Sequence, residues 1–215
     1  MRITVTGCQA SGKTTFIKDF IKNWPMYTTP KTTYRDLVKQ KKLKVNKEGS
    51  LESQMAILNY HLDEVQRYGK DDDVIFDRGV LDCLVYAMYL YEKGMGGIKE
   101  DDISTMMPLV TEGLKLYDIV FWLPLDQQIP MDETNTTENP IRSMDKTFRE
   151  EINNIFTSVN KSYLNHTGAP FPLVDCPAMI DLHGTRTERI AMAKMYITPE
   201  GKPYGEDAPS LIEIP

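Results

Sequence analysis

The sequence predicts an α/β fold in three layers, with a mostly parallel five-stranded sheet flanked by helices. Short apolar runs, which are typical of buried strands, occur at residues 1–6, 74–76, 119–123 and 179–182. Segments with apolar side chains at helical spacing separate these runs. Strands that alternate with helices along a chain indicate a largely parallel sheet with helices packed on it.

The helices are predicted from apolar residues that recur every three or four positions. They are expected at residues 16–24, 51–65, 81–91, 102–117 and 144–159, with a last helix from about 187 to 197 that Thr187 caps. Residues 126–139 are polar and indicate a long loop. We expect one domain at residues 1–198 that includes a lid segment at about 124–150, followed by an extended, proline-containing tail at 199–215.

Composition limits the class of protein. A chain of 215 residues with 41% hydrophobic residues is long enough for one well-buried domain. A net charge of -6 argues against a broad surface for polyanions, so that small ligands are favoured over nucleic acid. We find no apolar run long enough for a membrane span, no signal peptide and no paired cysteine pattern, and therefore expect a cytoplasmic protein without a membrane partner.

The strongest chemical signal is the segment 7–14, Gly-Cys-Gln-Ala-Ser-Gly-Lys-Thr, which matches G-x-x-x-x-G-K-[ST] in full between a predicted strand and a predicted helix. Such a loop surrounds a triphosphate with backbone N–H groups at a helix N-terminus. We expect Lys13 to reach the β- and γ-phosphates, Thr14 to hold Mg²⁺ and Thr15 to reach the α-phosphate. The predicted ATP-binding residues are Gly7, Gln9, Ala10, Ser11, Gly12, Lys13, Thr14 and Thr15.

A second signal is Asp77-Arg78-Gly79, at the carboxyl end of the predicted strand 74–76. Ligands collect at this edge of open α/β sheets. Asp77 is predicted to organise Mg²⁺ or to accept the proton of an attacking hydroxyl, and Arg78 to neutralise a phosphate. The alternative is a structural ion pair between neighbouring side chains.

A third signal is the pair Arg142 and Arg149, seven residues apart and hence on one face of a helix after the polar loop. Two guanidinium groups on a closing lid would stabilise charge on a transferred phosphoryl group. The alternative is a solvated helix face with Glu150 and Glu151 as local partners. The lysine-rich segment 39–47 is interpreted as a solvated face.

These segments together resemble the P-loop nucleoside and nucleotide kinases, and most closely the group that contains nicotinamide-riboside kinase domains and phage deoxynucleotide kinases. The likeness covers about residues 1–197 and is carried by the phosphate loop, the Asp77-Arg78-Gly79 segment with Asp82 and Tyr86, and residues 142–149. It implies transfer of the γ-phosphoryl group of Mg-ATP to a nucleoside or a nucleoside monophosphate. The predicted catalytic residues are Lys13, Asp77, Arg78, Arg142 and Arg149.

The resemblance also implies an acceptor site, with one departure. Similar kinases often carry a glutamate after their second strand, where this chain has Thr32 or Thr33, so that Asp77 becomes the leading candidate for the base. The predicted acceptor-binding residues are Arg35, Gln54 and Arg78, with a surface glutamine as the alternative for Gln54. The loop 183–186 is expected to pass the adenine.

Three other functions stay open from the sequence. The acceptor hydroxyl can belong to a nucleic acid, in which case residues 39–47 would line a groove with steeply salt-dependent binding. It can belong to a metabolite that is not a nucleotide. A regulatory ATP-binding module would have no acceptor. The oligomeric state, with a homodimer as one alternative, is not determined by the sequence.

Overall fold

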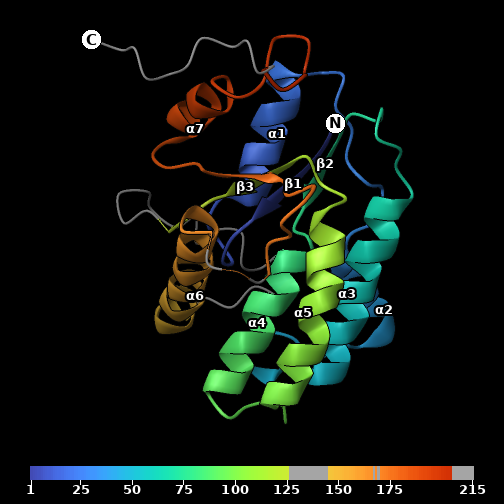
Figure 1. Ribbon diagram of the computed structural model, residues 1–215, viewed down its shortest axis with the longest axis vertical. Coiled ribbons are helices and arrows are strands. Elements are labelled where there is room, and N and C mark those ends of the chain that lie inside the picture. Colours follow the sequence, from blue (N-terminus) through green and yellow to red (C-terminus); the bar gives the residue numbers. More distant parts are fainter. Residues whose placement is uncertain (126–144, 167, 169, 205–215) are drawn as a thin grey trace.

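The computed structural model describes residues 1–125, 145–166, 168 and 170–204. Within this part the chain alternates strands and helices as the sequence predicts (Figure 1). In order, the elements are β1 (Arg2–Thr6), α1 (Lys13–Asn23), α2 (Tyr34–Lys41), the short 3-10 helix η1 (Asn46–Glu48), α3 (Leu51–Gln66), β2 (Val74–Asp77), α4 (Val80–Glu92), α5 (Glu100–Leu114), β3 (Ile119–Trp122), α6 (Lys146–Leu164), β4 (Ala178–Asp181) and α7 (Arg186–Ala193).

The sheet has the strand order β2-β1-β3-β4, and each neighbouring pair is parallel. The carboxyl ends of the strands therefore meet at one edge. Val5 in β1 lies opposite Asp77 in β2, and Thr6 lies opposite Trp122 in β3. This register brings the loop after β1 beside the segment that follows β2, which is the edge where the sequence predicts the site.

The described residues form four strands, one fewer than the five predicted. A segment near Thr28 supplies only an isolated parallel bridge to Val74. Thr28 N–H donates to Asp73 O, and Ile75 N–H donates to Thr28 O. Pro25 and Pro30 flank this bridge, and proline lacks the N–H that a longer ladder needs.

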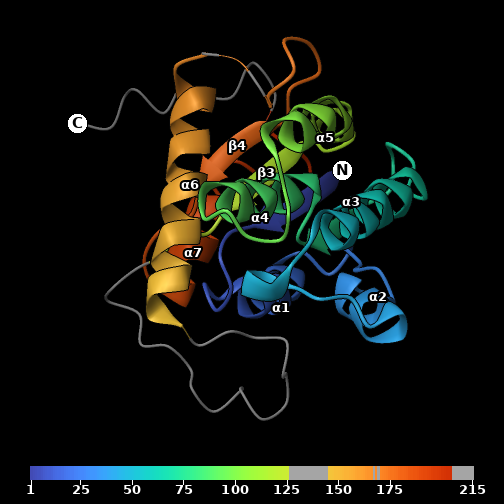
Figure 2. The same ribbon diagram turned by 90° about the horizontal axis from the view of Figure 1, so that it is seen from below.

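Helices cover both faces of the sheet (Figures 1 and 2). One face packs against α1 and α7, and the other packs against α3, α4, α5 and α6. Side chains of the strands alternate between these layers: Ile3 and Ile75 belong to the cluster with α1, whereas Val74 and Phe76 belong to the opposite cluster. Both faces of each strand are thus buried, which explains the uniformly apolar runs.

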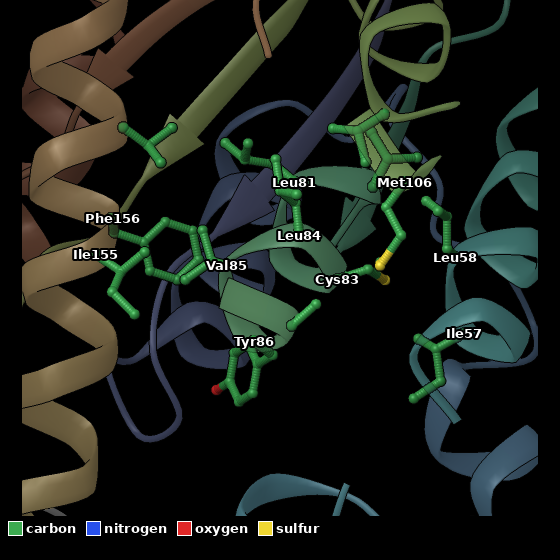
Figure 3. Close-up of a cluster of buried hydrophobic side chains, with 14 of the residues drawn as sticks. Ile57, Leu58, Leu81, Cys83, Leu84, Val85, Tyr86, Met106, Ile155 and Phe156 are labelled. Atoms are coloured by element: carbon green, nitrogen blue, oxygen red, sulfur yellow. The ribbon is translucent and has the colours of Figure 1, made fainter. Parts of the chain in front are cut away.

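The larger layer is organised around α4, which is buried along most of its length. In Figure 3 its side chains extend toward α6 on one side, where Phe156 and Ile155 lie, and toward α3 on the other. Burial of several such side chains stabilises the layer by about 1.5–3 kcal/mol each relative to exposure. A stable α4 fixes the polar residues at its N-terminus.

Two helices differ from the prediction. Helix α2 lies in a segment that the sequence presents only as a charged run, because its single buried apolar residue, Val38, gives little periodicity. Helix α7 is capped by Thr185 rather than Thr187: Thr185 Oγ1 accepts from Glu188 N–H, and Glu188 in turn accepts from Thr185 N–H.

The loop 126–139 and most of the predicted lid lie outside the described residues. So do most of the tail 199–215 and Arg142. No helix in the described part is long and apolar enough to cross a membrane.

Candidate active site

The phosphate loop, residues 7–14, leads from β1 into α1. Its two glycines have φ angles of 136° (Gly7) and 92° (Gly12), which other residues adopt only with strain. A Cβ atom at Gly7 would lie 2.6 Å from the carbonyl oxygen of Leu123. Both glycines of the motif are therefore required by the backbone, beside any role in binding.

Lys13 folds back onto the phosphate loop. Its ammonium group donates to the carbonyl oxygens of Gly7, at 2.9 Å, and Cys8, and to Ser11 Oγ at 3.3 Å. Burial lowers the pKa of Lys13 to about 7, and the positive charge of Arg78 contributes to the same shift. An anion in this loop would favour the charged form again, because an opposite charge nearby offsets desolvation.

Asp77 ends β2 and faces the start of α1. Its Oδ2 accepts a hydrogen bond from Thr14 Oγ1 at 3.0 Å and forms an ion pair with Arg35 Nη1 at 3.2 Å. Burial opposes ionisation of Asp77, but the positive charges of Arg35, Lys13 and Arg78 outweigh it and lower the pKa. The carboxylate is therefore ionised at neutral pH.

Thr14 and Asp77 fit a magnesium ion. A hydroxyl and a carboxylate are the oxygen ligands that Mg²⁺ prefers, and Asp77 Oδ1 is buried without a hydrogen-bond partner among the described residues. The described part contains no cluster of three or more His, Cys, Asp or Glu side chains suited to a metal. The chemistry therefore suits an ion held mainly by phosphate and water, with one or two protein ligands.

Arg78 joins the phosphate loop to α4. It is buried, its φ of 80° is unusual for a residue other than glycine, and its guanidinium donates to Gly7 O at 3.1 Å, to Asp82 Oδ1 at 2.5 Å and to Tyr86 Oη at 3.4 Å. Asp82 also accepts from Thr6 Oγ1 at 2.7 Å. A backbone held in this sparsely populated region is typical of functional sites.

Three buried arginines from different elements each donate to a carbonyl oxygen of the phosphate loop. The carbonyls belong to alternate residues of the loop. The pairs are Arg78 Nη1 with Gly7 O (3.1 Å), Arg149 Nε with Gln9 O (3.0 Å) and Arg189 Nη1 with Ser11 O (2.7 Å).

The predicted arginine pair is thus only partly described. Arg149 lies on α6 and is 9% exposed, which excludes the solvated helix face considered above. It contacts the loop that the sequence predicts to hold the nucleotide. Arg142 lies outside the described residues, so that its position relative to Arg149 stays a prediction.

A cavity of about 830 Å³, counted with the open solvent at its mouth, extends from the phosphate loop to α3. Lys13 and Thr14 line one end. Gln54, Ile57 and His61 line the other, because the spacing i, i+3, i+7 places them on one face of α3. Gln54 is 3% exposed and is therefore not a surface glutamine.

Across from α3, Cys83 and Tyr86 of α4 complete the wall of the cavity, and Figure 3 shows Cys83 and Ile57 on the facing sides of these helices.

A protein-family model described as "AAA domain" matches residues 2–166, more than half of the chain. The chain belongs to this AAA-domain family. No curated protein matches the sequence.

The AAA domain shares its fold with solved kinases. A deoxyadenosine kinase from M. mycoides, with dCMP and dCDP bound, has a TM-score of 0.65 at 16% identity, over 91% of this chain and 97% of the other. A thymidylate kinase from Candida albicans has a TM-score of 0.59 at 15% identity, over 90% and 89%. The protein NadR, in complex with NAD and AMP-PNP, has a TM-score of 0.57 at 15% identity, over 91% of this chain and 48% of NadR. The predicted P-loop kinase fold is confirmed.

Several residues of this AAA domain's site are not found by sequence reasoning. Tyr34 lies under both Arg35 and Arg78, with their guanidinium carbons 5.0 and 5.6 Å from the ring centroid. His61 is the seventh residue after Gln54, so that helical spacing alone could have indicated it. No sequence motif indicates Arg189, because it lies in the short helix α7, far along the chain from the phosphate loop.

His61 remains neutral at physiological pH. Burial lowers its pKa to about 4, against the negative charge of Asp82, which raises it. Its Nε2 is buried and has no hydrogen-bond partner in the described part of the chain. A neutral imidazole can both donate and accept, so that it suits an uncharged polar ligand.

Proposed function

We propose that the protein transfers the γ-phosphoryl group of Mg-ATP to a nucleoside or a nucleoside monophosphate. The observation that carries this proposal is the continuity of the cavity, which has a phosphate loop at one end and the polar face of α3 at the other. A module that only holds ATP needs no second polar wall. Phosphoryl transfer requires a donor and an acceptor in one enclosed space.

At the donor end, the phosphate loop binds the triphosphate through backbone N–H groups, and Lys13 leaves its loop carbonyls for the phosphate oxygens. Thr15, which also lines the cavity, contacts the α-phosphate. The loop 183–186 lies beside the adenine. Arg186, which ends this loop as the first residue of α7, forms a bidentate ion pair with Asp19 of α1, at 2.8 and 2.7 Å, and this pair keeps the loop close to the phosphate-binding helix.

Thr14 and Asp77 would hold the magnesium ion, which would draw charge from the phosphate oxygens. Asp77 is ionised and carries one unpartnered oxygen, so that it can also accept the proton of the acceptor hydroxyl. Arg78 is fixed by Asp82 and Tyr86 and places its positive charge beside the transferred group. Arg149, with Arg142, stabilises the same charge from the lid.

At the acceptor end, Gln54 and His61 present hydrogen-bonding groups from α3, and Tyr34 and Tyr86 present aromatic rings. A flat base with polar edges fits such walls, because ring faces stack and edge atoms need partners. Arg35 lies between this end and Asp77, where it can neutralise a hydroxyl or a phosphate of the acceptor. The rival acceptor on nucleic acid is less well supported, because the segment 39–47 contributes only Val45 and Asn46 to the cavity lining and none of its lysines.

The proposal is tested with γ-labelled ATP against nucleosides, nucleoside monophosphates, single-stranded DNA and non-nucleotide alcohols. Label is expected in one nucleoside or monophosphate, and in no product when Lys13→Ala replaces the wild type. Label only on DNA, or only in inorganic phosphate, would reject the proposal in favour of a nucleic-acid kinase or an ATPase.

A further inference from the structure

The last helix of the described chain reaches the phosphate loop through one side chain. Arg189 on α7 is 5% exposed, and its Nη1 donates to the carbonyl oxygen of Ser11 at 2.7 Å across 178 residues of sequence. The same nitrogen would lie 2.9 Å from a Cβ atom at Gly12. Arg189 is thus packed directly against the peptide that joins Ser11 to Gly12.

The orientation of this peptide decides what the loop offers to a ligand. In a planar trans peptide the C=O and N–H bonds point in opposite directions. Because Ser11 C=O points to Arg189, Gly12 N–H points away from α7. Gly12 and Lys13 line the cavity, whereas none of the described residues that line it comes from α7. Arg189 therefore holds the carbonyl on one side while the N–H faces the other.

No backbone hydrogen bond of the described residues involves Ser11 O or Gly12 N–H and so secures this orientation. Gly12 has a φ of 92°, and glycine adopts positive and negative φ with similar ease. Rotation of the Ser11–Gly12 peptide would turn the N–H outward and the carbonyl oxygen inward. A donor for an anion would then become an acceptor that repels it.

We infer that Arg189 is a positioning residue for triphosphate binding: its hydrogen bond to Ser11 O fixes the peptide so that Gly12 N–H faces the phosphates. The inference rests on the proposed function, since it takes a triphosphate as the ligand of the loop. Arg189 itself contacts no phosphate. It acts through the backbone.

The test compares the binding of Mg-ATP and inorganic tripolyphosphate by isothermal titration calorimetry. In Arg189→Met, both ligands are expected to bind on the order of tenfold to a hundredfold more weakly, as for loss of one hydrogen bond to a charged group. The two losses should be equal, because the adenine is not involved. Lys194→Met is the control: it removes an exposed positive charge at the end of the same helix and should change neither affinity.

Arg189→Lys keeps the charge with a different donor geometry, and its affinities should fall between those of wild type and Arg189→Met. Thermal unfolding checks each variant. If Arg189→Met does not fold, Arg189→Gln takes its place in the same comparison. Unchanged tripolyphosphate binding, a loss for ATP alone, or full recovery with lysine would each overturn the inference. Failure of the wild type to bind either ligand would instead refute the proposed function.

Discussion

Arg35 and Asp77 form an ion pair of 3.2 Å between helix α2 and the end of β2. The same Asp77 oxygen accepts the hydroxyl hydrogen bond of Thr14. One carboxylate therefore links the acceptor side of the cavity to the donor side, and its protonation depends on both.

Replacing Arg35 by Gln is predicted to raise the pKa of Asp77, because Arg35 is the strongest of the positive charges that lower it against burial. Activity that needs the ionised carboxylate should then be lost at a higher pH. The acid limb of the kcat/KM profile is expected to move to higher pH, because an opposite charge this close favours the ionised carboxylate. Lys39→Gln, a change at an exposed residue of the same helix, is the control and should leave the acid limb in place. An acid limb that does not move in Arg35→Gln would show that Arg35 does not control the pKa of Asp77.

Binding of ATP is predicted to take up protons at alkaline pH. The pKa of Lys13 is about 7 in the ligand-free protein and should return toward its ordinary value beside a triphosphate. At pH 8.5, where phosphate is ionised, uptake should approach one proton, and it should vanish well below pH 7. Calorimetry in two buffers of different ionisation enthalpy measures it. Lys13→Met should show none; equal uptake in wild type and variant would contradict the assignment.

The same lysine predicts how the ligand-free protein responds to pH. Its folded pKa is lowered, so that between about pH 7 and its ordinary value the unfolded chain binds more protons than the folded one. Stability should therefore rise with pH across this window. The free energy of unfolding, measured by urea denaturation at pH 7 and pH 9, should increase less in Lys13→Met than in wild type. A larger increase in the free energy of unfolding in Lys13→Met than in wild type would show that Lys13 is not buried in solution.

Asp77→Asn is predicted to lower turnover far more than ATP affinity, because a base or metal organiser acts mainly in the transition state. Steady-state kinetics at saturating acceptor, together with ATP titration, separate the two effects. Asp82→Asn is a useful comparison: Asp82 binds Thr6 and Arg78, so that its loss should reduce stability as well. Equal losses of turnover and affinity in Asp77→Asn would indicate a structural role.

Arg142→Ala and Arg149→Ala are each predicted to reduce turnover by on the order of tenfold to a thousandfold, a cost of about 1.4 to 4 kcal/mol in the barrier. Arg149→Ala should also weaken ATP binding, because Arg149 Nε holds the carbonyl of Gln9 in the phosphate loop. Lysine should rescue only partly, since it lacks the planar fork. If both alanine variants keep wild-type rates with saturating ATP and acceptor, the lid assignment is wrong.

The layered fold could be predicted because its determinants are local. The continuous apolar run at β2 and the helical spacing of Leu51, Met55, Leu58 and Leu62 reflect burial on both faces and on one face, respectively. Helix α2 could not be predicted, because Val38 is its single buried apolar residue and gives little periodicity. The predicted fifth strand is not formed among the described residues, because Pro25 and Pro30 restrict the segment near Thr28 to one bridge.

The residues of the candidate site also fall into two groups, those that the sequence predicts and those that it does not. Lys13, Thr14, Asp77 and Arg78 follow strands whose ends meet at one edge, so that short motifs locate them. Arg189 was not predictable, because its contact with Ser11 depends on how α7 packs against α1 rather than on any spacing.

We propose that one cavity holds both donor and acceptor. This proposal is tested most directly by following the transfer of the γ-label from ATP to a panel of nucleosides and nucleoside monophosphates, with wild type, Lys13→Ala and Gln54→Ala proteins side by side. Wild type should yield a labelled nucleotide product and Lys13→Ala none. Gln54→Ala should show a raised KM for the acceptor and a near-normal KM for ATP. ATP consumption without any labelled acceptor, or a Gln54→Ala enzyme indistinguishable from wild type, would contradict it.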